Sequence, residues 1–152
     1  MGDHWGTMAG ILNIGEMGAL ALHILTELAL LRQENPEGRH TVQHIAGDLQ
    51  ASAHTLQKVA RRLIMMQLIE GTRGAAGGLR LVANPKRITL LQVLEGVEGK
   101  FNSNGCMFAK RVCPSRARCA FAGVTENMEK MVREYFAATT IAELCSVAAQ
   151  PA

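Results

Sequence analysis

Residues 41–80 read TVQHIAGDLQASAHTLQKVARRLIMMQLIEGTRGAAGGLR, and this stretch decides the fold. Its apolar residues fall mostly three or four positions apart around a short polar interval at residues 50–52, which predicts two helices joined by a tight turn. Thr41 and Ser52 stand where these helices are expected to begin, and their hydroxyls can accept hydrogen bonds from first-turn amides. The spacing therefore predicts a helix-turn-helix. The apolar residues that define it are Val42, Ile45, Leu49, Leu56, Val59, Leu63 and Ile64.

The pattern changes after Met65. A short apolar run, LIEG at 68–71, is followed by the glycine-rich TRGAAGG at 72–78 and by a second run, LRLV at 79–82. Two short runs separated by a glycine-rich tip predict a β-hairpin. We therefore expect a mainly α protein with a small β-wing, that is, a winged helix-turn-helix followed by a long C-terminal dimerisation helix.

Residues 52–80 contain five cations but one acid, Glu70, whereas the formal net charge of the whole chain is +3. A helix whose first turns carry hydroxyl, imidazole, amide and amino groups offers donors to base edges and phosphates, and an arginine at a wing tip suits a narrow minor groove. These features together indicate contact with double-stranded DNA, and the simpler alternative is a solvated helix beside an ordinary hairpin. The candidate DNA-binding residues are Ser52, His54, Thr55, Gln57, Lys58, Arg61, Arg62, Arg73 and Arg80.

Helical periodicity continues on both sides of this unit. An apolar stripe over residues 13–32 predicts a helix that packs under the winged helix, and Thr89 with Gln92 forms a capping-box pattern that predicts a short helix ending at Gly99. A further amphipathic helix is expected from residue 124. Its stripe needs a partner, and the same helix of a second subunit is the nearest source, the alternative being that it packs only on its own core. The candidate dimer-interface residues are Met128, Met131, Val132 and Tyr135.

Three of the four cysteines form a C-x6-C-x5-C pattern at Cys106, Cys113 and Cys119. The interval between the first and the last contains four cations and no acid, and neighbouring cations favour the thiolate form of a cysteine. The spacing is neither that of a zinc ribbon nor that of a ferredoxin, so the residues alone leave metal ligands and redox-active thiols both open. The fourth cysteine, Cys145, stands in an apolar helical context and is expected to be buried.

The stretches TRGAAGGLRL at 72–81 and ITLLQVLEGVEG at 88–99 closely resemble the wing and the following helix of the Rrf2 family of bacterial winged-helix regulators. The resemblance continues through ALHILTELALL at 21–31 and TTIAELC at 139–145, so it covers nearly the whole chain. It implies a homodimer that binds a palindromic operator in double-stranded DNA. In sensors of this family, three cysteines before the dimerisation helix hold an iron-sulphur cluster. The resemblance therefore assigns Cys106, Cys113 and Cys119 to a 2Fe-2S or 4Fe-4S cluster, with His23 as a candidate fourth ligand.

The 152 residues, 48% of them hydrophobic, suffice for one domain with a modest core. Four cysteines without a secretory signal favour reduced thiols in the cytoplasm, and Glu16, His23 and Glu27 interrupt the apolar N-terminal stretch, which argues against a membrane span. We expect a flexible leader at 1–10, a winged-helix DNA-binding domain at 11–99, a cluster-binding loop at 100–123, the dimerisation and closing helices at 124–147 and a tail at 148–152.

The sequence contains no catalytic constellation, so we do not expect an enzyme. The leading interpretation is a transcriptional regulator, most simply a repressor, that senses iron, redox state or nitric oxide through the cluster. One alternative keeps DNA binding but senses thiol oxidation or a small ligand without metal. The other is a small iron-sulphur carrier or electron-transfer protein, against which the basic second helix of the helix-turn-helix argues.

Overall fold

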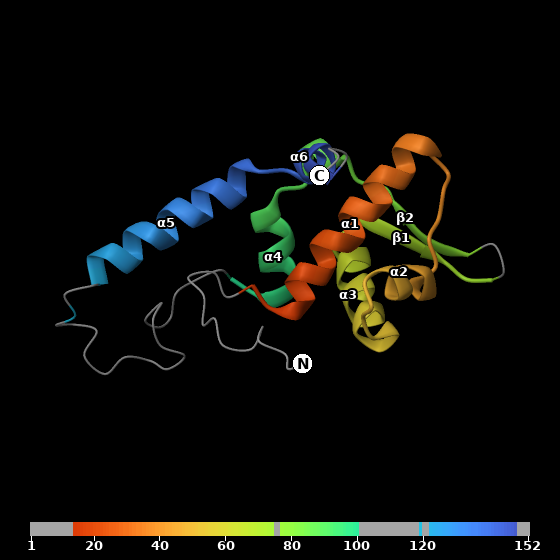
Figure 1. Cartoon of the computed structure of the whole chain (residues 1–152), viewed down its shortest axis with the longest axis horizontal. Helices are drawn as coiled ribbons and strands as arrows, with labels where there is room; N and C mark the ends of the chain where they lie inside the picture. Colours follow the sequence, from red (N-terminus) through yellow and green to blue (C-terminus); the bar gives the residue numbers. More distant parts are fainter. Residues whose placement is uncertain (1–13, 75–76, 101–118, 120–121, 149–152) are drawn as a thin grey trace, which may run out of the picture.

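The computed structural model describes residues 14–74, 77–100, 119 and 122–148. The expected leader at 1–10, most of the expected cluster loop and nearly all of the expected tail lie outside these residues. The elements in chain order are α1 (Glu16–Glu34), α2 (Val42–Asp48), α3 (Ala53–Met65), β1 (Ile69–Thr72), β2 (Gly78–Leu81), the short 3-10 helix η2 (Pro85–Arg87), α4 (Leu90–Glu98), α5 (Ala122–Ala138) and α6 (Ile141–Ala148). Helices dominate and β1 and β2 form an antiparallel sheet, which confirms the predicted fold class (Figure 1).

Helix α1 lies at the centre of the molecule and contacts α3, α4, α6 and β2 (Figure 1). Ala21, Ile24, Leu25 and Leu28 are almost completely buried because they repeat at helical spacing on the side that meets these elements. The core that they enter is completed by Leu56, Val59 and Leu63 of α3, Val93 and Val97 of α4, and Ile141 of α6. The prediction of a helix that packs under the winged helix is therefore confirmed.

Helices α2 and α3 form the helix-turn-helix, and Gln50 in the turn between them has a positive φ of 50°. Thr41 caps α2 as predicted, because its hydroxyl accepts a hydrogen bond from the backbone N of His44 at 3.1 Å. The expected cap of α3 is wrong in one respect. Ser52 does precede the helix, but its side chain makes no capping hydrogen bond. Ser52 is exposed, so water can satisfy the first-turn amides, and α3 is held by the burial of its apolar face.

The wing is a two-stranded hairpin in which Glu70 lies opposite Arg80. The segment between α1 and α2 extends this sheet, since His40 and Leu79 exchange two backbone hydrogen bonds of 3.1 and 2.8 Å. Leu79 and Leu81 are buried in the core. Because successive side chains of a strand point to opposite faces, Arg80 lies on the other face of the wing.

Two further caps fix α4 and α6. The hydroxyl of Thr89 accepts from the backbone N of Gln92 at 3.2 Å, as the capping-box pattern predicts, and α4 ends before Gly99, whose φ is 97°. A reciprocal capping box begins α6, where the carboxylate of Glu143 accepts from the backbone N of Thr140 at 2.6 Å and the hydroxyl of Thr140 accepts from the backbone N of Glu143 at 3.4 Å. This second box, T-x-x-E at residues 140–143, was not among the predicted caps.

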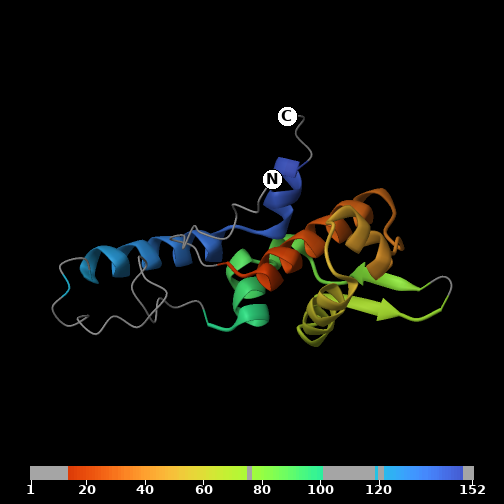
Figure 2. The ribbon, with the colours of Figure 1, turned by 60° about the horizontal axis from the view of Figure 1, so that its bottom comes forward.

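Helix α5 begins at Ala122, slightly before the expected residue 124, and projects from the rest of the molecule (Figure 2). Near its C-terminal end Phe136 is buried with Leu90 and Leu94 of α4. No helix within the described ranges is long and apolar enough to cross a membrane.

Candidate functional site

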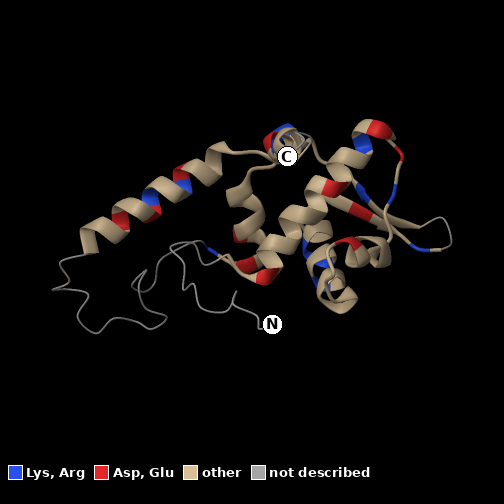
Figure 3. Ribbon diagram, in the orientation of Figure 1, with Lys and Arg blue, Asp and Glu red and all other residues tan. Residues whose placement is uncertain are grey.

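The solvent face of α3 carries most of the candidate DNA-binding residues. Lys58, Arg61 and Arg62 are exposed, and they make no ion pair or side-chain hydrogen bond with any residue that the structure describes. The opposite face of α3 is buried, so the helix cannot turn these cations inward. Figure 3 shows basic residues along α3 and near the end of the wing. At the N-terminal end of the same helix Ser52, His54 and Gln57 are exposed and Thr55 is half-buried.

Arg73 lies where the wing leaves β1. It is exposed and has no ion-pair partner in the part of the chain that the structure describes. Gly74 follows with a φ of 104°, a conformation that favours glycine and lets the chain turn sharply. The guanidinium of Arg73 therefore has no partner among the residues that the structure describes, and it lies beside the turn of the hairpin.

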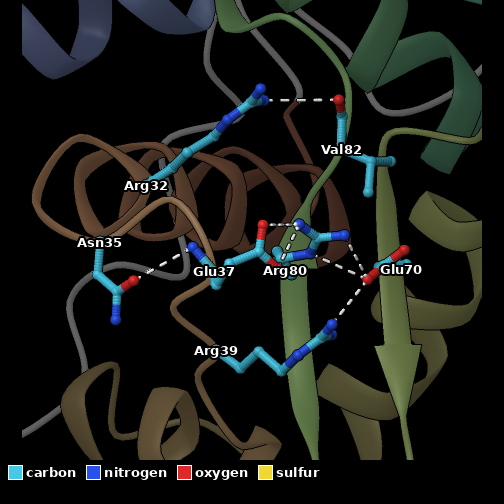
Figure 4. Close-up of polar contacts among 7 residues, drawn as sticks. All are labelled: Arg32, Asn35, Glu37, Arg39, Glu70, Arg80 and Val82. Atoms are coloured by element: carbon cyan, nitrogen blue, oxygen red, sulfur yellow. Dashed lines mark hydrogen bonds and ion pairs between the residues drawn. The ribbon is translucent and has the colours of Figure 1, made fainter.

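Arg80 is placed differently from the other candidates. Its Nε donates a hydrogen bond to Oε1 of Glu70 at 2.9 Å, and its Nη1 donates to both carboxylate oxygens of Glu37 at 3.0 Å (Figure 4). Nη2 of Arg39 donates to the same oxygen of Glu70 at 2.9 Å. The guanidinium of Arg80 is thus occupied by protein carboxylates, and contact with DNA requires an exchange of partners.

The two arginines also determine the charge state of Glu70. Hydrogen bonds from Arg39 and then from Arg80 hold the pKa of the Glu70 carboxyl below its usual range. Nη1 of Arg39 is buried and has no hydrogen-bond partner among the described residues. Sequence reasoning missed Glu37 and Arg39. Glu37 lies in a turn after α1 and Arg39 lies next to His40, which pairs with β2, and no local sequence pattern indicates that they meet the wing.

The predicted metal ligands fall partly within the described residues. Cys106 and Cys113 lie outside them. Cys119 is half-buried, forms no disulphide, and accepts a hydrogen bond through its backbone carbonyl from the backbone N of Ala122 at 3.2 Å, so it adjoins the first turn of α5. His23 is exposed on α1. No group of three or more His, Cys, Asp or Glu residues able to hold a metal occurs among the residues described.

Cys145 has a structural environment. Its side chain is buried in α6, and its Sγ lies 3.8 Å from the backbone oxygen of Thr26 in α1. Burial raises the pKa of the Cys145 thiol. The expectation that this cysteine is buried is confirmed, and its environment disfavours the thiolate that metal binding requires.

The candidate dimer-interface residues divide between two faces of α5. Met131 and Tyr135 are each 67% exposed, Val124 is 50% exposed, and Met128 is half-buried. These four recur at helical spacing and share the outer face of α5. Val132 instead packs against the buried cluster that α4 and α5 form together.

Comparison with known proteins identifies the family. The sequence profile of Rrf2, described as an iron-dependent transcriptional regulator, matches residues 14–147. The chain belongs to the Rrf2 family. This membership confirms the resemblance that the wing and the following helix indicate, and Rrf2 proteins are DNA-binding transcriptional regulators.

Individual Rrf2 relatives agree with this assignment. NsrR of Bacillus subtilis, an HTH-type transcriptional regulator, is 32% identical over 101 residues, which make up 66% of this chain and 69% of NsrR. BadM of Rhodopseudomonas palustris, whose name describes an HTH-type transcriptional regulator, is 40% identical over 73 residues, so this chain covers 44% of its length. The structure of CymR, the global cysteine regulator of B. subtilis, is similar to this one with a TM-score of 0.67 and 26% identity. The match covers 90% of this chain and 98% of CymR.

Proposed function

We propose that this Rrf2 protein is a homodimeric transcriptional regulator, most simply a repressor, that binds a palindromic operator in double-stranded DNA. The observation that carries the proposal is the set of exposed cations on α3, Lys58, Arg61 and Arg62, which have no partner among the described residues. Unpaired cations on a helix held by its buried face are available to DNA phosphates without breaking protein contacts.

The parts of the winged helix take separate roles in this proposal. In a helix-turn-helix, the N-terminal residues of the second helix contact base edges in the major groove. We assign base contacts to the N-terminal turns of α3 and phosphate contacts to its three cations, and Arg73 enters the minor groove from the wing. The residues assigned to base contacts are Ser52, His54, Thr55 and Gln57.

A second copy of the chain covers the outer face of α5. Met131 and Tyr135 expose large apolar surfaces on a helix that projects from the rest of the molecule (Figure 1). An isologous contact between two such helices buries both surfaces and relates the two α3 helices by a two-fold axis, as a palindromic site requires. Met128 and Val124 extend this contact, and Val132 supports it from the side facing α4.

Sensing is assigned to an iron-sulphur cluster held by Cys106, Cys113 and Cys119, with His23 as the candidate fourth ligand. Cys119, the one of these three cysteines that the structure describes, suits an iron-sulphur cluster, because it is partly exposed and lies next to the first turn of α5, a helix of 17 residues. The amides of a helix N-terminus favour a thiolate. A bound cluster supplies a centre that responds to iron, oxidants and nitric oxide, and its three cysteines lie in the sequence between the winged helix and α5.

A second candidate function keeps the DNA site and replaces the metal by thiol oxidation or a small ligand. The likeness to CymR favours it, because the description of CymR names cysteine and not iron. Iron content separates the two candidates.

Selection from a pool of random duplexes tests DNA binding directly. The expected product is a sequence with two-fold symmetry whose half-sites lie about 10 base pairs apart, or a multiple of that distance. Recovery of asymmetric sequences would contradict the two-fold arrangement. A pool with no enrichment would contradict operator binding itself.

Iron and sulphide content of protein purified without oxygen tests the cluster. We expect both elements together with visible absorbance, and replacement of Cys106, Cys113 or Cys119 by Ala should remove or destabilise the chromophore. Cys145→Ala is the matched control and should leave it intact, because that thiol is buried in α6. Changing His23 should alter the spectrum or the lifetime without preventing assembly. An iron-free protein whose DNA binding follows thiol oxidation would favour the second candidate.

A further inference from the structure

A row of charged side chains crosses the base of the wing (Figure 4). The pairing of His40 with Leu79 brings Arg39 beside Arg80, and Arg80 lies opposite Glu70. Two adjacent like charges in a sheet repel, so the carboxylates of Glu70 and Glu37 are needed to offset the two guanidinium groups. Both carboxylates bond to Arg80, but they hold it in different ways.

Glu70 orients the guanidinium. Its Oε1 accepts hydrogen bonds of 2.9 Å from Nε of Arg80 and from Nη2 of Arg39, and it lies 2.9 Å from Nη2 of Arg80 in an ion pair. These bonds hold one edge of the Arg80 group and leave Nη1 to point toward Glu37 (Figure 4). The guanidinium is therefore fixed in place before any ligand reaches Nη1.

Glu37 is held far more loosely. Its side chain is 78% exposed, compared with 39% for Glu70, and its two oxygens share the single nitrogen Nη1 of Arg80. An exposed ion pair of this kind contributes little to stability because water screens it and both side chains lose freedom. A competing anion can therefore replace Glu37 without disturbing the bonds to Glu70.

We propose that the Nη1 side of Arg80 is a binding site for a backbone phosphate of duplex DNA, and that Glu37 occupies this site as an internal competitor when DNA is absent. The two oxygens of a carboxylate present the same charge and a similar spacing to a guanidinium as two oxygens of a phosphate. The inference rests on the proposed function, since it names a further contact of the DNA site and a residue that limits its affinity.

The position of Arg80 on the wing suits this role. Glu70, its cross-strand partner, precedes Arg73 by three residues. At about 3.3 Å per residue, the arginine assigned to the minor groove lies about 10 Å along the wing from the pair of Glu70 and Arg80. Phosphates line both sides of a minor groove, so a duplex that receives Arg73 brings its backbone close to the site. When a phosphate replaces Glu37, Arg80 gains a contact with the DNA backbone that exists only in the protein–DNA complex.

Duplex binding by Glu37→Gln tests the competition, with Glu34→Gln as the matched control. Glu34 is also an exposed glutamate near the end of α1, and it has no partner among the described residues. We expect Glu37→Gln to bind a fixed duplex several-fold more tightly than the wild type, because no carboxylate has to be displaced, and to keep the slope of log K against log salt, because both proteins neutralise the same phosphates in the complex. Glu34→Gln should give a smaller gain with no change of slope.

A double-mutant cycle with Arg80→Gln assigns the effect to the pair. In the Arg80→Gln background Glu37→Gln should change duplex binding no more than Glu34→Gln does, because no guanidinium remains to be released. Equal effects of Glu37→Gln and Glu34→Gln would overturn the inference, and so would weaker binding by Glu37→Gln, which would show that Glu37 supports the wing and does not compete with DNA.

Inorganic phosphate tests the anion site without DNA. In Glu37→Gln, phosphate should shift the NMR signal of the Arg80 Nε–H, which is identified by its loss in Arg80→Gln. The wild type and Glu34→Gln should show no shift at the same concentration. Failure of the wild type to bind any duplex would reject the proposed function, whereas wild-type duplex binding combined with an unshifted Arg80 signal in Glu37→Gln would reject this inference alone.

Discussion

Glu98, the last residue of α4, caps the N-terminus of α1 through Gly18. Its Oε1 accepts from the backbone N of Gly18 at 2.7 Å and its Oε2 accepts from the backbone N of Gly15 at 3.0 Å. Gly15 is the N-cap of α1 and has no capping side chain, so a carboxylate from another helix takes that part. A Cβ on Gly18 would lie 2.7 Å from Oε1 of Glu98 and 2.8 Å from Cδ2 of Leu94, which explains why glycine stands there.

Loss of this cap should destabilise the protein. We expect Glu98→Ala and Gly18→Ala each to lower the free energy of unfolding by about 1–2 kcal/mol. In Glu98→Ala the first-turn amides of α1 lose their charged acceptor, and in Gly18→Ala the new Cβ fills the space that the Glu98 carboxylate occupies. Urea denaturation measures the change. Gly47→Ala is the control, since a Cβ there meets nothing within 4 Å and a helical Ala is favoured. If Gly18→Ala were as stable as Gly47→Ala, the close approach would have no energetic effect.

Arg73 is expected to contribute specifically to duplex binding. Arg73→Ala should weaken the affinity by about 1–3 kcal/mol, the range for a specific arginine contact, and fluorescence anisotropy at physiological salt measures it. Lys86→Ala is the control, because Lys86 is an exposed cation on η2, outside the helix-turn-helix and the wing. Equal affinities of the two variants would remove the wing from the DNA site.

The outer face of α5 should control the oligomeric state. Met131→Glu places a charge on the proposed interface and should yield monomers in sedimentation analysis, with poor operator affinity because the half-sites are no longer bound together. Val147→Glu makes a comparable change in α6 at a side chain of nearly equal exposure, 66% against 67% for Met131. A dimeric Met131→Glu would place the interface elsewhere.

The network at the base of the wing should make stability depend on pH through Glu70. The pKa of Glu70 in the folded protein is lowered from 4.5, so its contribution to stability is complete above 4.5 and disappears as the pH falls through the folded value. Glu70→Gln should therefore be less stable than the wild type at neutral pH, and urea denaturation at a series of pH values should show the difference shrinking below 4.5. A difference that does not change with pH would mean that the charge of Glu70 is unimportant.

Local patterns predicted the parts of the fold that depend on neighbouring residues. Thr41 and Thr89 cap the helices that follow them, and the apolar spacing of residues 42–64 produces the buried side of the helix-turn-helix. The pairing of Glu70 with Arg80 also follows from a hairpin with its turn in the glycine-rich stretch. Each of these contacts joins residues that are close in the sequence.

Contacts between distant segments could not be predicted in the same way. Arg80 was assigned to DNA because its charge fits, but its guanidinium meets Glu37 only because the segment before α2 pairs with β2. The cap formed by Glu98 is likewise set by how α1 and α4 cross. Ser52 shows that a local pattern can also fail, because its hydroxyl stands in the correct sequence position but makes no capping hydrogen bond.

The salt dependence of duplex binding tests the central claim, that α3 faces DNA, most directly. The slope of log K against log salt counts the phosphates that the protein neutralises. We predict that Lys58→Ala, Arg61→Ala and Arg62→Ala each reduce this slope by about 0.9, whereas Lys86→Ala and Arg87→Ala on η2 leave it unchanged. Slopes equal to that of the wild type in all three α3 variants would contradict the account.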